Sequence, residues 1–409
     1  MPAPGRTIYI AGAGIAGLTL ALALARFGAT VVVLERAQGL AEIGAGLQLS
    51  PNARRLLNRL GLDAAIAAKS LEPTGIDIYP FRANRPLVTL ELGLAMRAKF
   101  GAPYAVMHRA ELADILFRAC RRFANIDVAF GVRSFDARSD ADGVSVNFEQ
   151  AKGAARDARV FGLVGADGVN AATRTGLLRG PEAHYSGLVA WRALLDFAAL
   201  EGLLALDRTS LLMAPGYHAV CYPLPHRKCF NVALFTKERP GAAASVTAPT
   251  RPRLPRAAQP SRHFSAILEA GGDNWGLWPV GTVAAPAWHE GGIGLIGDAA
   301  HAMLPFQAQG AAMAIEDAAI LAPLLMTEAT VEAAFRRFDG LRRKRIARVA
   351  SVSAGNGGVF HLAWPFTLGR DLALLAQGKR GHLRRLGWLY GYDPAPEVEA
   401  AGARPGDGP

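Results

Sequence analysis

The 409-residue chain has only three cysteines, Cys120, Cys221 and Cys229, and they show no paired close spacing. A disulfide framework or a cysteine-based zinc site needs closely spaced pairs, so the sequence predicts neither. We therefore predict no metal site. The scarcity of thiols is also typical of the reducing cytoplasm, where we expect the protein to work.

Long apolar runs are scarce as well. After Arg6, the apolar run over residues 8–24 resembles a signal peptide, but Gly12, Gly14 and Gly17 interrupt it. No other stretch reaches the roughly 18 uninterrupted apolar residues that a membrane-spanning helix needs. We therefore expect neither secretion nor a membrane span.

Acidic residues are outnumbered, because 34 Asp and Glu stand against 45 Lys and Arg, a formal net charge of +11. The basic residues are spread along the chain, and the one dense cluster, at 336–337 and 342–345, fits the solvated face of a helix. The charge therefore indicates attraction for anionic substrates and cofactors, and we predict no nucleic-acid partner. At 51% hydrophobic, the chain has enough apolar residues for two or three domains.

The N-terminal segment alternates apolar runs with a glycine-rich turn. Residues 7–11 predict a buried strand, 12–17 (Gly-Ala-Gly-Ile-Ala-Gly) a turn and 18–27 a helix, and a second strand over 31–34 ends at Glu35. This order is typical of a dinucleotide site, in which the glycines admit a pyrophosphate and the acid accepts ribose hydroxyls. An acid here favours FAD or NAD over NADP.

A late segment favours a flavin. Strand 293–296 leads into Asp298, Pro305 fixes the next turn, and Gly310 opens a helix predicted over 311–325. A strand-end carboxylate can accept hydrogen bonds from a polyol, and a helix N-terminus stabilises an anion. A flavin offers both, as its ribityl chain and its reduced ring.

Three further motifs are compatible with the same cofactor. Strand 163–166 ends at Asp167, and the glycine-rich loop 44–49 precedes a helix capped by residues 50–52. Arg109 opens another predicted helix, where it is either a surface cation or a contact to the cofactor. His301, after the late aspartate, is as compatible with helix-cap packing as with a ligand contact.

With these motifs the chain resembles the class A FAD-dependent aromatic monooxygenases, the p-hydroxybenzoate hydroxylase class. Within it, the chain is most similar to the salicylate hydroxylase, 3-hydroxybenzoate 6-hydroxylase and 6-hydroxynicotinate 3-monooxygenase group. The three fingerprints of the class match here at Gly12, Gly14, Gly17 and Glu35; at Asp167, Gly168 and Arg174; and at Gly297, Asp298, Pro305 and Gly310. Segments 44–52, 190–193 and 388–393 also match this group. The resemblance implies FAD contacts from Gly12, Gly14, Ala16, Gly17, Glu35, Arg36, Gly46, Leu47, Gln48, Arg109, Val132, Asp167, Asp298, Pro305, Gly310 and Ala311.

The resemblance implies an α/β fold with two interleaved domains. A Rossmann-like FAD-binding domain would comprise residues 1–75, 101–180 and 285–350, and a mixed β-sheet substrate domain 76–100 and 181–284. A helical C-terminal region and tail, 351–409, would follow. NADH or NADPH would act as a transient co-substrate, and oxygen would form a flavin C4a-hydroperoxide that hydroxylates a small aromatic ring. We expect a monomer or homodimer.

The substrate would lie against the segment 213–224. His218, Val220 and Tyr222 alternate within it, so on a strand they share one face. The matching His and Tyr of the relatives sit at the substrate, which implies that His218 is a base or hydrogen-bond partner and Tyr222 an orienting donor. The alternative is that both residues are structural, with His218 at the edge of the sheet and Tyr222 as an aromatic side chain of the sheet. Gln48 can hydrogen-bond but cannot act as a base.

The arginine surplus indicates an acidic substrate, and Arg82, Arg85 and Arg192 are all candidates for its carboxylate. Two features depart from the class: Ala171 replaces a usual serine, and 240–263 reads as a loop or diverged surface. Two alternatives stay open. One is a monooxygenase or epoxidase of a larger quinone- or polyketide-type substrate, and the other a non-catalytic dinucleotide-binding protein.

Overall fold

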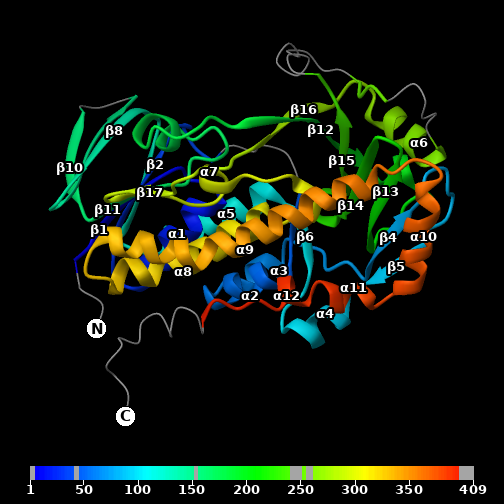
Figure 1. The fold of residues 1–409 in the computed structure, drawn as a ribbon, viewed down its shortest axis with the longest axis horizontal. Coiled ribbons are helices and arrows are strands. Elements are labelled where there is room, and N and C mark those ends of the chain that lie inside the picture. The colour runs from blue at the N-terminus through cyan, green and yellow to red at the C-terminus, as the bar shows by residue number, and fades with distance from the viewer. Residues whose placement is uncertain (1–4, 41–45, 152–154, 240–250, 255–260, 396–409) are drawn as a thin grey trace.

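The computed structural model describes residues 5–40, 46–151, 155–239, 251–254 and 261–395. Two large sheets lie toward opposite ends of the molecule, and two long helices run lengthwise between them (Figure 1). The predicted loop 240–263 lies mostly outside the described residues. Of its described part, residues 251–254 have no regular structure, and a helix begins at Arg262.

The six-stranded sheet carries the N-terminal unit. Its inner strands pair in parallel, with Ile8 opposite Val31 on one side and Gly162 on the other. The sheet order is β17 (His289–Glu290), β18 (Ile293–Leu295), β11 (Gly162–Gly165), β1 (Thr7–Ala11), β2 (Thr30–Glu35), β7 (Ile126–Phe130). Near-continuous apolar strands such as β1 and β11 are expected in a parallel sheet, because both of its faces are covered. The predicted strand 7–11 matches β1 residue for residue.

The seven-stranded sheet is mixed, because β13 pairs in parallel with β4 and the other neighbours pair antiparallel. Its order is β16 (Gly276–Thr282), β12 (His184–Asp196), β15 (Cys229–Lys237), β14 (Tyr217–Leu224), β13 (Arg208–Ala214), β4 (Gly75–Tyr79), β5 (Val88–Glu91). The segment 213–224 turns at Pro215 and Gly216 to form the β13–β14 hairpin, and β14 carries His218, Val220 and Tyr222 on one strand.

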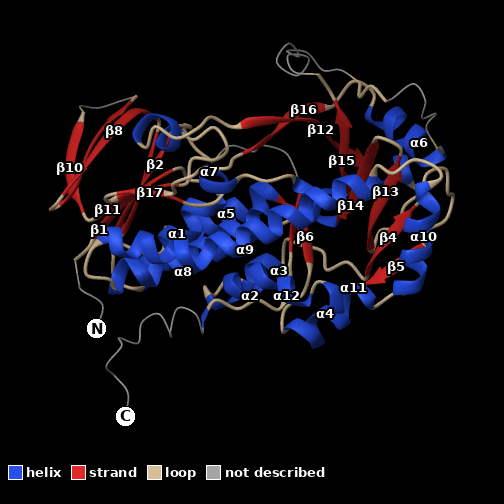
Figure 2. Ribbon diagram, viewed as in Figure 1, coloured by secondary structure: helices blue, strands red, loops and turns tan. Residues whose placement is uncertain are grey.

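Two smaller sheets complete the strands: β8 (Val132–Asp140), β9 (Gly143–Gln150) and β10 (Arg156–Val160) form one, and β3 (Gly46–Leu49) with β6 (Ala105–His108) the other. Figure 2 shows the helices gathered between and around the two large sheets. The α-helices are α1 (Ile15–Arg26), α2 (Pro51–Arg59), α3 (Asp63–Ala67), α4 (Gly93–Phe100), α5 (Arg109–Cys120), α6 (Arg262–Gly271), α7 (Asp298–His301), α8 (Gly310–Thr327), α9 (Val331–Phe360), α10 (Phe366–Gln377), α11 (Gly381–Arg385) and α12 (Gly387–Tyr390). Four short helical turns are η1 (Thr173–Leu177), η2 (Phe197–Leu200), η3 (Pro225–Arg227) and η4 (Pro305–Gln307). The predicted α/β class, with a Rossmann-like sheet, a mixed sheet and a helical C-terminus, is confirmed.

Helix α8 lies at the centre of the core, packed against α1 and α9. Among the described residues it is the one helix long and apolar enough to cross a membrane, and 72% of it is buried inside the protein. Apolar character on all sides is also what a fully buried core helix requires. The three cysteines are buried, and none of them forms a disulfide.

The basic cluster on α9 differs from its prediction. Arg336 and Lys344 are exposed as expected and Arg343 is half-buried, but Arg342 is fully buried and pairs with Glu316 and Asp317 of α8 at 2.7 Å each. The prediction of a solvated face was therefore wrong for Arg342, and also for Arg345, which pairs with Glu316. Their partners lie on another helix, far away in the sequence. We call this group, with Arg345, His301 and Asn52, the α8–α9 charge cluster.

Candidate active site

A cavity of about 280 Å³ lies between the C-terminal ends of the parallel strands and one face of the seven-stranded sheet. Eleven of the predicted site residues line it: Gly14, Ala16, Gly46, Leu47, Gln48, Arg109, Tyr222, Asp298, Pro305, Gly310 and Ala311. The other seven do not line it: Gly12, Gly17, Glu35, Arg36, Val132, Asp167 and His218.

The glycines of the turn after β1 have different structural roles. Gly12 has φ of +105°, and a Cβ there would lie 2.6 Å from the Ala166 carbonyl oxygen. A Cβ on Gly17 would overlap the Gly12 carbonyl oxygen, whereas one on Gly14 would meet nothing within 4 Å. Gly12 and Gly17 therefore pack the turn, and Gly14 leaves open space at an uncapped helix N-terminus.

Glu35 holds this turn in place. One carboxylate oxygen accepts the Ala13 N–H at 2.8 Å, and the other accepts the Ala37 N–H at 2.8 Å. Each oxygen keeps a further acceptor site. The side chain therefore ties the turn to the end of β2 while it retains the capacity to accept hydrogen bonds from a ribose.

Asp298 and the N-terminus of α8 form another part of the cavity lining. The Asp298 carboxylate makes no hydrogen bond to the described residues and lies beside Gly310, whose built Cβ would be 3.8 Å from its Oδ1. Helix α8 begins at Gly310 without a side-chain cap. A free acceptor thus stands next to free N–H donors, as the late motif predicts for a ribityl chain and an anionic ring.

Asp167 and Arg174 differ in whether their polar atoms have hydrogen-bond partners within the protein. Asp167 accepts two hydrogen bonds from Thr173 through Oδ2, while its buried Oδ1 has no partner, and burial raises its pKa. Arg174 is buried and donates to three backbone carbonyls, those of Val169, Pro181 and Ala299. Arg174 therefore joins the second and third fingerprints as a structural clamp.

The glycine loop is attached to the substrate-side sheet. The Gly46 N–H donates to Asn231 Oδ1 at 2.7 Å, and a Cβ on Gly46 would overlap the Tyr222 ring. Only glycine fits so close to a tyrosine ring. The side chain of Gln48 is held by a hydrogen bond from the buried Tyr104 hydroxyl. Asn231 and Tyr104 were not predicted, because strand pairing brings them here and no local motif marks them.

The β14 face carries the proposed catalytic pair. Val220 and Tyr222 line the cavity, and the Tyr222 hydroxyl makes no hydrogen bond within the described residues. Burial raises the pKa of Tyr222, so its phenol remains a donor. His218 lies further along the same strand, stacked at 4.8 Å on Phe235, which lines the cavity. Burial, and then the neighbouring His361, lower the pKa of His218, which keeps its ring neutral.

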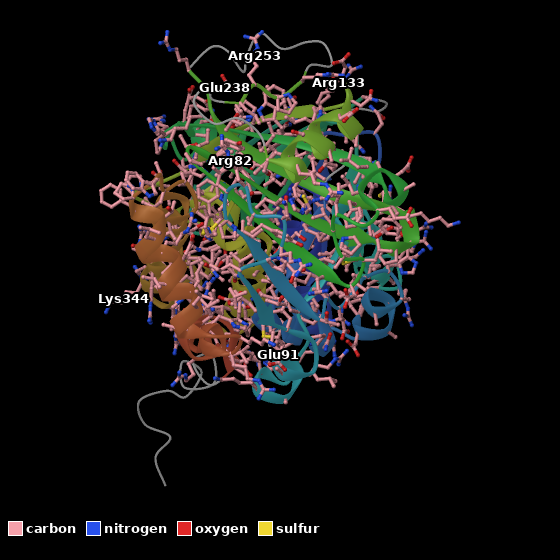
Figure 3. The ribbon with its side chains drawn as sticks, turned by 90° about the vertical axis from the view of Figure 1, so that its right-hand side faces the viewer. Arg82, Glu91, Arg133, Glu238, Arg253 and Lys344 are labelled. Carbon is pink, nitrogen blue, oxygen red and sulfur yellow. The ribbon has the colours of Figure 1, made fainter. Side chains whose placement is uncertain are left out.

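Of the three candidate arginines, Arg192 alone lines the cavity. Its guanidinium makes no hydrogen bond or ion pair within the described residues, and its Nε is buried without a partner. It lies 5.5 Å from the Trp278 ring centroid, and burial lowers its pKa. Arg82 and Arg85 are exposed on the β4–β5 connection, and Arg82 lies on the outer face seen in Figure 3.

Three of the candidate residues, Arg36, Val132 and His301, lie outside the cavity. Arg36 is exposed after β2, and Val132 is buried in the apolar cluster beneath the three-stranded sheet. His301 is buried and hydrogen-bonded to Asp317 at 2.7 Å, so it belongs to the α8–α9 charge cluster.

The residues present fit FAD. The open space at Gly14, the free Asp298 carboxylate and the orphaned Asp167 oxygen are features that a dinucleotide with a polyol chain would satisfy. Groups of His, Cys, Asp and Glu able to hold a metal ion are absent from the part of the chain described here.

The family model described as "FAD binding domain" matches residues 6–355. The chain belongs to this family. It is 33% identical to 3-amino-4-hydroxybenzoate 2-monooxygenase of Streptomyces platensis over 95% of this chain and 96% of that one. It is 31% identical to 3-hydroxybenzoate 6-hydroxylase 1 of Aquipseudomonas alcaligenes, over 94% and 97%. A salicylate hydroxylase substrate complex shares the fold, with a TM-score of 0.74, 24% identity and 99% of each chain covered.

The predicted class is confirmed: the chain is a FAD-dependent aromatic monooxygenase, for which NAD(P)H is the usual reductant. The non-catalytic alternative is therefore set aside. The match to the FAD-binding family model confirms the cofactor prediction.

Proposed function

We propose that this protein hydroxylates a small aromatic or N-heteroaromatic acid that already carries a hydroxyl group, with NAD(P)H and oxygen as co-substrates. When bound, FAD supplies the redox chemistry, accepting electrons from NAD(P)H and activating oxygen. Gly14, Asp298 and the N-terminus of α8 would hold its pyrophosphate, ribityl chain and ring. The named relatives act on hydroxybenzoates and aminohydroxybenzoates, which supports this substrate class.

The unpaired guanidinium of Arg192 carries the proposal. Arg192 is partly buried, and a cation that is withdrawn from water without a partner is costly unless a ligand supplies the counter-charge. Arg109 adds a second positive charge at the cavity, and the two arginines repel each other electrostatically. A carboxylate bound at Arg192 would relieve both costs, so an acid fits this cavity better than a neutral quinone or polyketide.

Tyr222 and His218 would orient the ring. We assign Tyr222 as the donor that orients the substrate and His218 as the acceptor of the proton from its hydroxyl. His218 does not line the cavity, so this assignment requires the substrate to reach its ring beside Phe235, which stacks on His218 and does line the cavity. A phenolate is the better nucleophile for hydroxylation, and the aromatic side chains beside His218 exclude water.

A substrate panel tests the proposal. The purified protein should be yellow, and a hydroxybenzoate or hydroxypyridine carboxylate should stimulate NADH or NADPH oxidation with matching oxygen uptake. The product should be heavier by one oxygen atom. Stimulation by quinones or polyketides, and by no small acid, would contradict the proposal.

We also propose the three-part domain division given above and a monomer or homodimer in the cytoplasm. The buried, unpaired thiols support the location. Light scattering after gel filtration would measure the assembly, and a tetramer would contradict it.

A further inference from the structure

Behind the proposed substrate site, two histidine rings are joined by a hydrogen bond. The Nδ1 of His218 lies 2.8 Å from the Nε2 of His361. His361 caps the C-terminus of α9, more than a hundred residues later in the chain, and its carbonyl accepts the Gly216 N–H at 3.2 Å. The β13–β14 hairpin therefore holds the second ring in position.

The two rings differ in their access to water. His218 is 1% exposed and enclosed by the rings of Phe235, Phe306 and Phe360. His361 is half-buried, and the residues after it, 363–366, are exposed. The pair thus spans from an enclosed interior position to the surface of the protein.

We propose that His361 is the relay that carries the substrate's proton from His218 to solvent. This inference rests on the proposed role of His218 as acceptor of the hydroxyl proton. In the step, the substrate O–H gives its proton to His218 Nε2, and His218 Nδ1–H passes its own to His361 Nε2. His361 then releases its Nδ1 proton to water. The substrate loses one proton, solvent gains one, and both rings end neutral as the opposite tautomers.

A concerted transfer avoids placing a positive charge on the buried His218 ring. A positive charge on His218 would be costly in a pocket of phenylalanine rings. Burial lowers the pKa of His218 well below its usual range and that of His361 to about 4. From the elements packed against the pair, β13, β15, η4 and α9, the titratable or charged groups that act on it are each other and Lys237. Among the described residues, none of the groups that act on the pair is a carboxylate that could stabilise an imidazolium, so a transfer that leaves both rings neutral is favoured.

The test follows substrate ionisation without turnover. FAD-loaded enzyme without NADH is mixed with a phenolic acid that the panel identifies, and phenolate absorbance is recorded by stopped flow. In His361→Gln, the glutamine can accept from His218 but cannot relay, so phenolate should form about 10²-fold more slowly with an unchanged Kd. His226→Gln, the same change at an exposed histidine, should match the wild type. In His361→Ala, added imidazole should restore part of the lost rate.

The outcomes distinguish the proposed relay role of His361 from the proposed role of His218 as the base. If His218→Gln is slow but His361→Gln is as fast as the wild type, the relay is wrong and the role of His218 stands. If wild-type enzyme hydroxylates the acid without forming phenolate, or His218→Gln ionises it normally, the proposed base is wrong. A slow His361→Ala that imidazole does not accelerate, with unchanged melting temperature and FAD content, would assign His361 a positioning role and overturn the relay.

Discussion

The α8–α9 charge cluster and the cavity wall are two groups of polar side chains that differ both in burial and in their partners. In the cluster, Arg342, Glu316 and Asp317 are fully buried, and each is satisfied by a partner of the opposite charge. Along the cavity, Arg192 and Asp298 have no partner among the described residues.

Full burial together with a partner of opposite charge therefore distinguishes these structural groups from the partly buried, unpaired groups that are available to a ligand. A buried ion that has its counter-ion stabilises the fold only as long as both are present. A polar group that lines a cavity without a partner gains its hydrogen bonds when a ligand binds. Three substitutions and one acid titration test this difference. The first has the largest expected effect on the free energy of unfolding, and the last has the smallest.

Removal of Arg342 should have the largest effect. Among the described residues, Arg342→Met leaves buried Glu316 with only Arg345 and buried Asp317 with only His301 as a basic partner. Breaking a buried pair in this way costs about 3–5 kcal/mol. Chemical unfolding of the FAD-free protein would measure the loss. Arg343→Met, on the exposed side of the same helix, should cost less than about 1 kcal/mol. Equal losses in the two variants would remove the distinction.

Acid should weaken the same cluster. Burial alone would raise the pKa of Asp317, but His301, Arg342 and the Gly297 N–H outweigh it and lower the pKa to about 2. Because the folded pKa lies below the unfolded one, the carboxylate contributes stability above about pH 4, and this is lost as pH falls through about 2. The contribution is about 2 kcal/mol. Urea unfolding from pH 5 to 2 should show this slope, with Asp317→Asn flattening it and the exposed Asp114→Asn leaving it unchanged.

Removal of Arg192 should affect the substrate and leave the fold intact. Arg192→Met replaces an unpaired, partly buried cation with an apolar chain, so the free energy of unfolding should stay within about 1 kcal/mol of the wild type or rise. Loss of a charged hydrogen-bond partner should raise KM for the aromatic acid about 10- to 100-fold. The amide analogue should be affected less. An unchanged KM for the acid, or the same rise in Arg82→Met, would assign the carboxylate elsewhere.

Gly14→Ala should change the fold least. The added Cβ meets nothing within 4 Å, so the FAD-free protein should unfold as the wild type does. The methyl group would occupy space at the helix N-terminus, and FAD affinity measured by flavin fluorescence should fall at least about 10-fold. Gly17→Ala is the matched contrast, because its Cβ would overlap the Gly12 carbonyl and destabilise the protein even without FAD. Normal FAD affinity in Gly14→Ala would refute the assigned pyrophosphate position.

The sequence predicted the cofactor side of the cavity better than the substrate side. Strand 7–11 matched β1 throughout, and the helix predicted over 311–325 lies within α8. These segments follow local rules, since glycine spacing and apolar periodicity act over a few residues. The substrate side depends on strand register. Asn231 and Phe235 reach the cavity because they pair with Tyr222 and His218 across β14 and β15.

The sequence by itself determined the class of the protein, its cofactor, and the strand that carries His218 and Tyr222, because each is encoded in a short contiguous motif. Only the tertiary structure showed that, of the three candidate arginines, Arg192 lines the cavity and has no hydrogen-bond partner among the described residues. It alone showed that Arg342 is a buried counter-ion and that His361 meets His218. Each of these is a contact between side chains far apart in the sequence, and local patterns carry no information about such pairing.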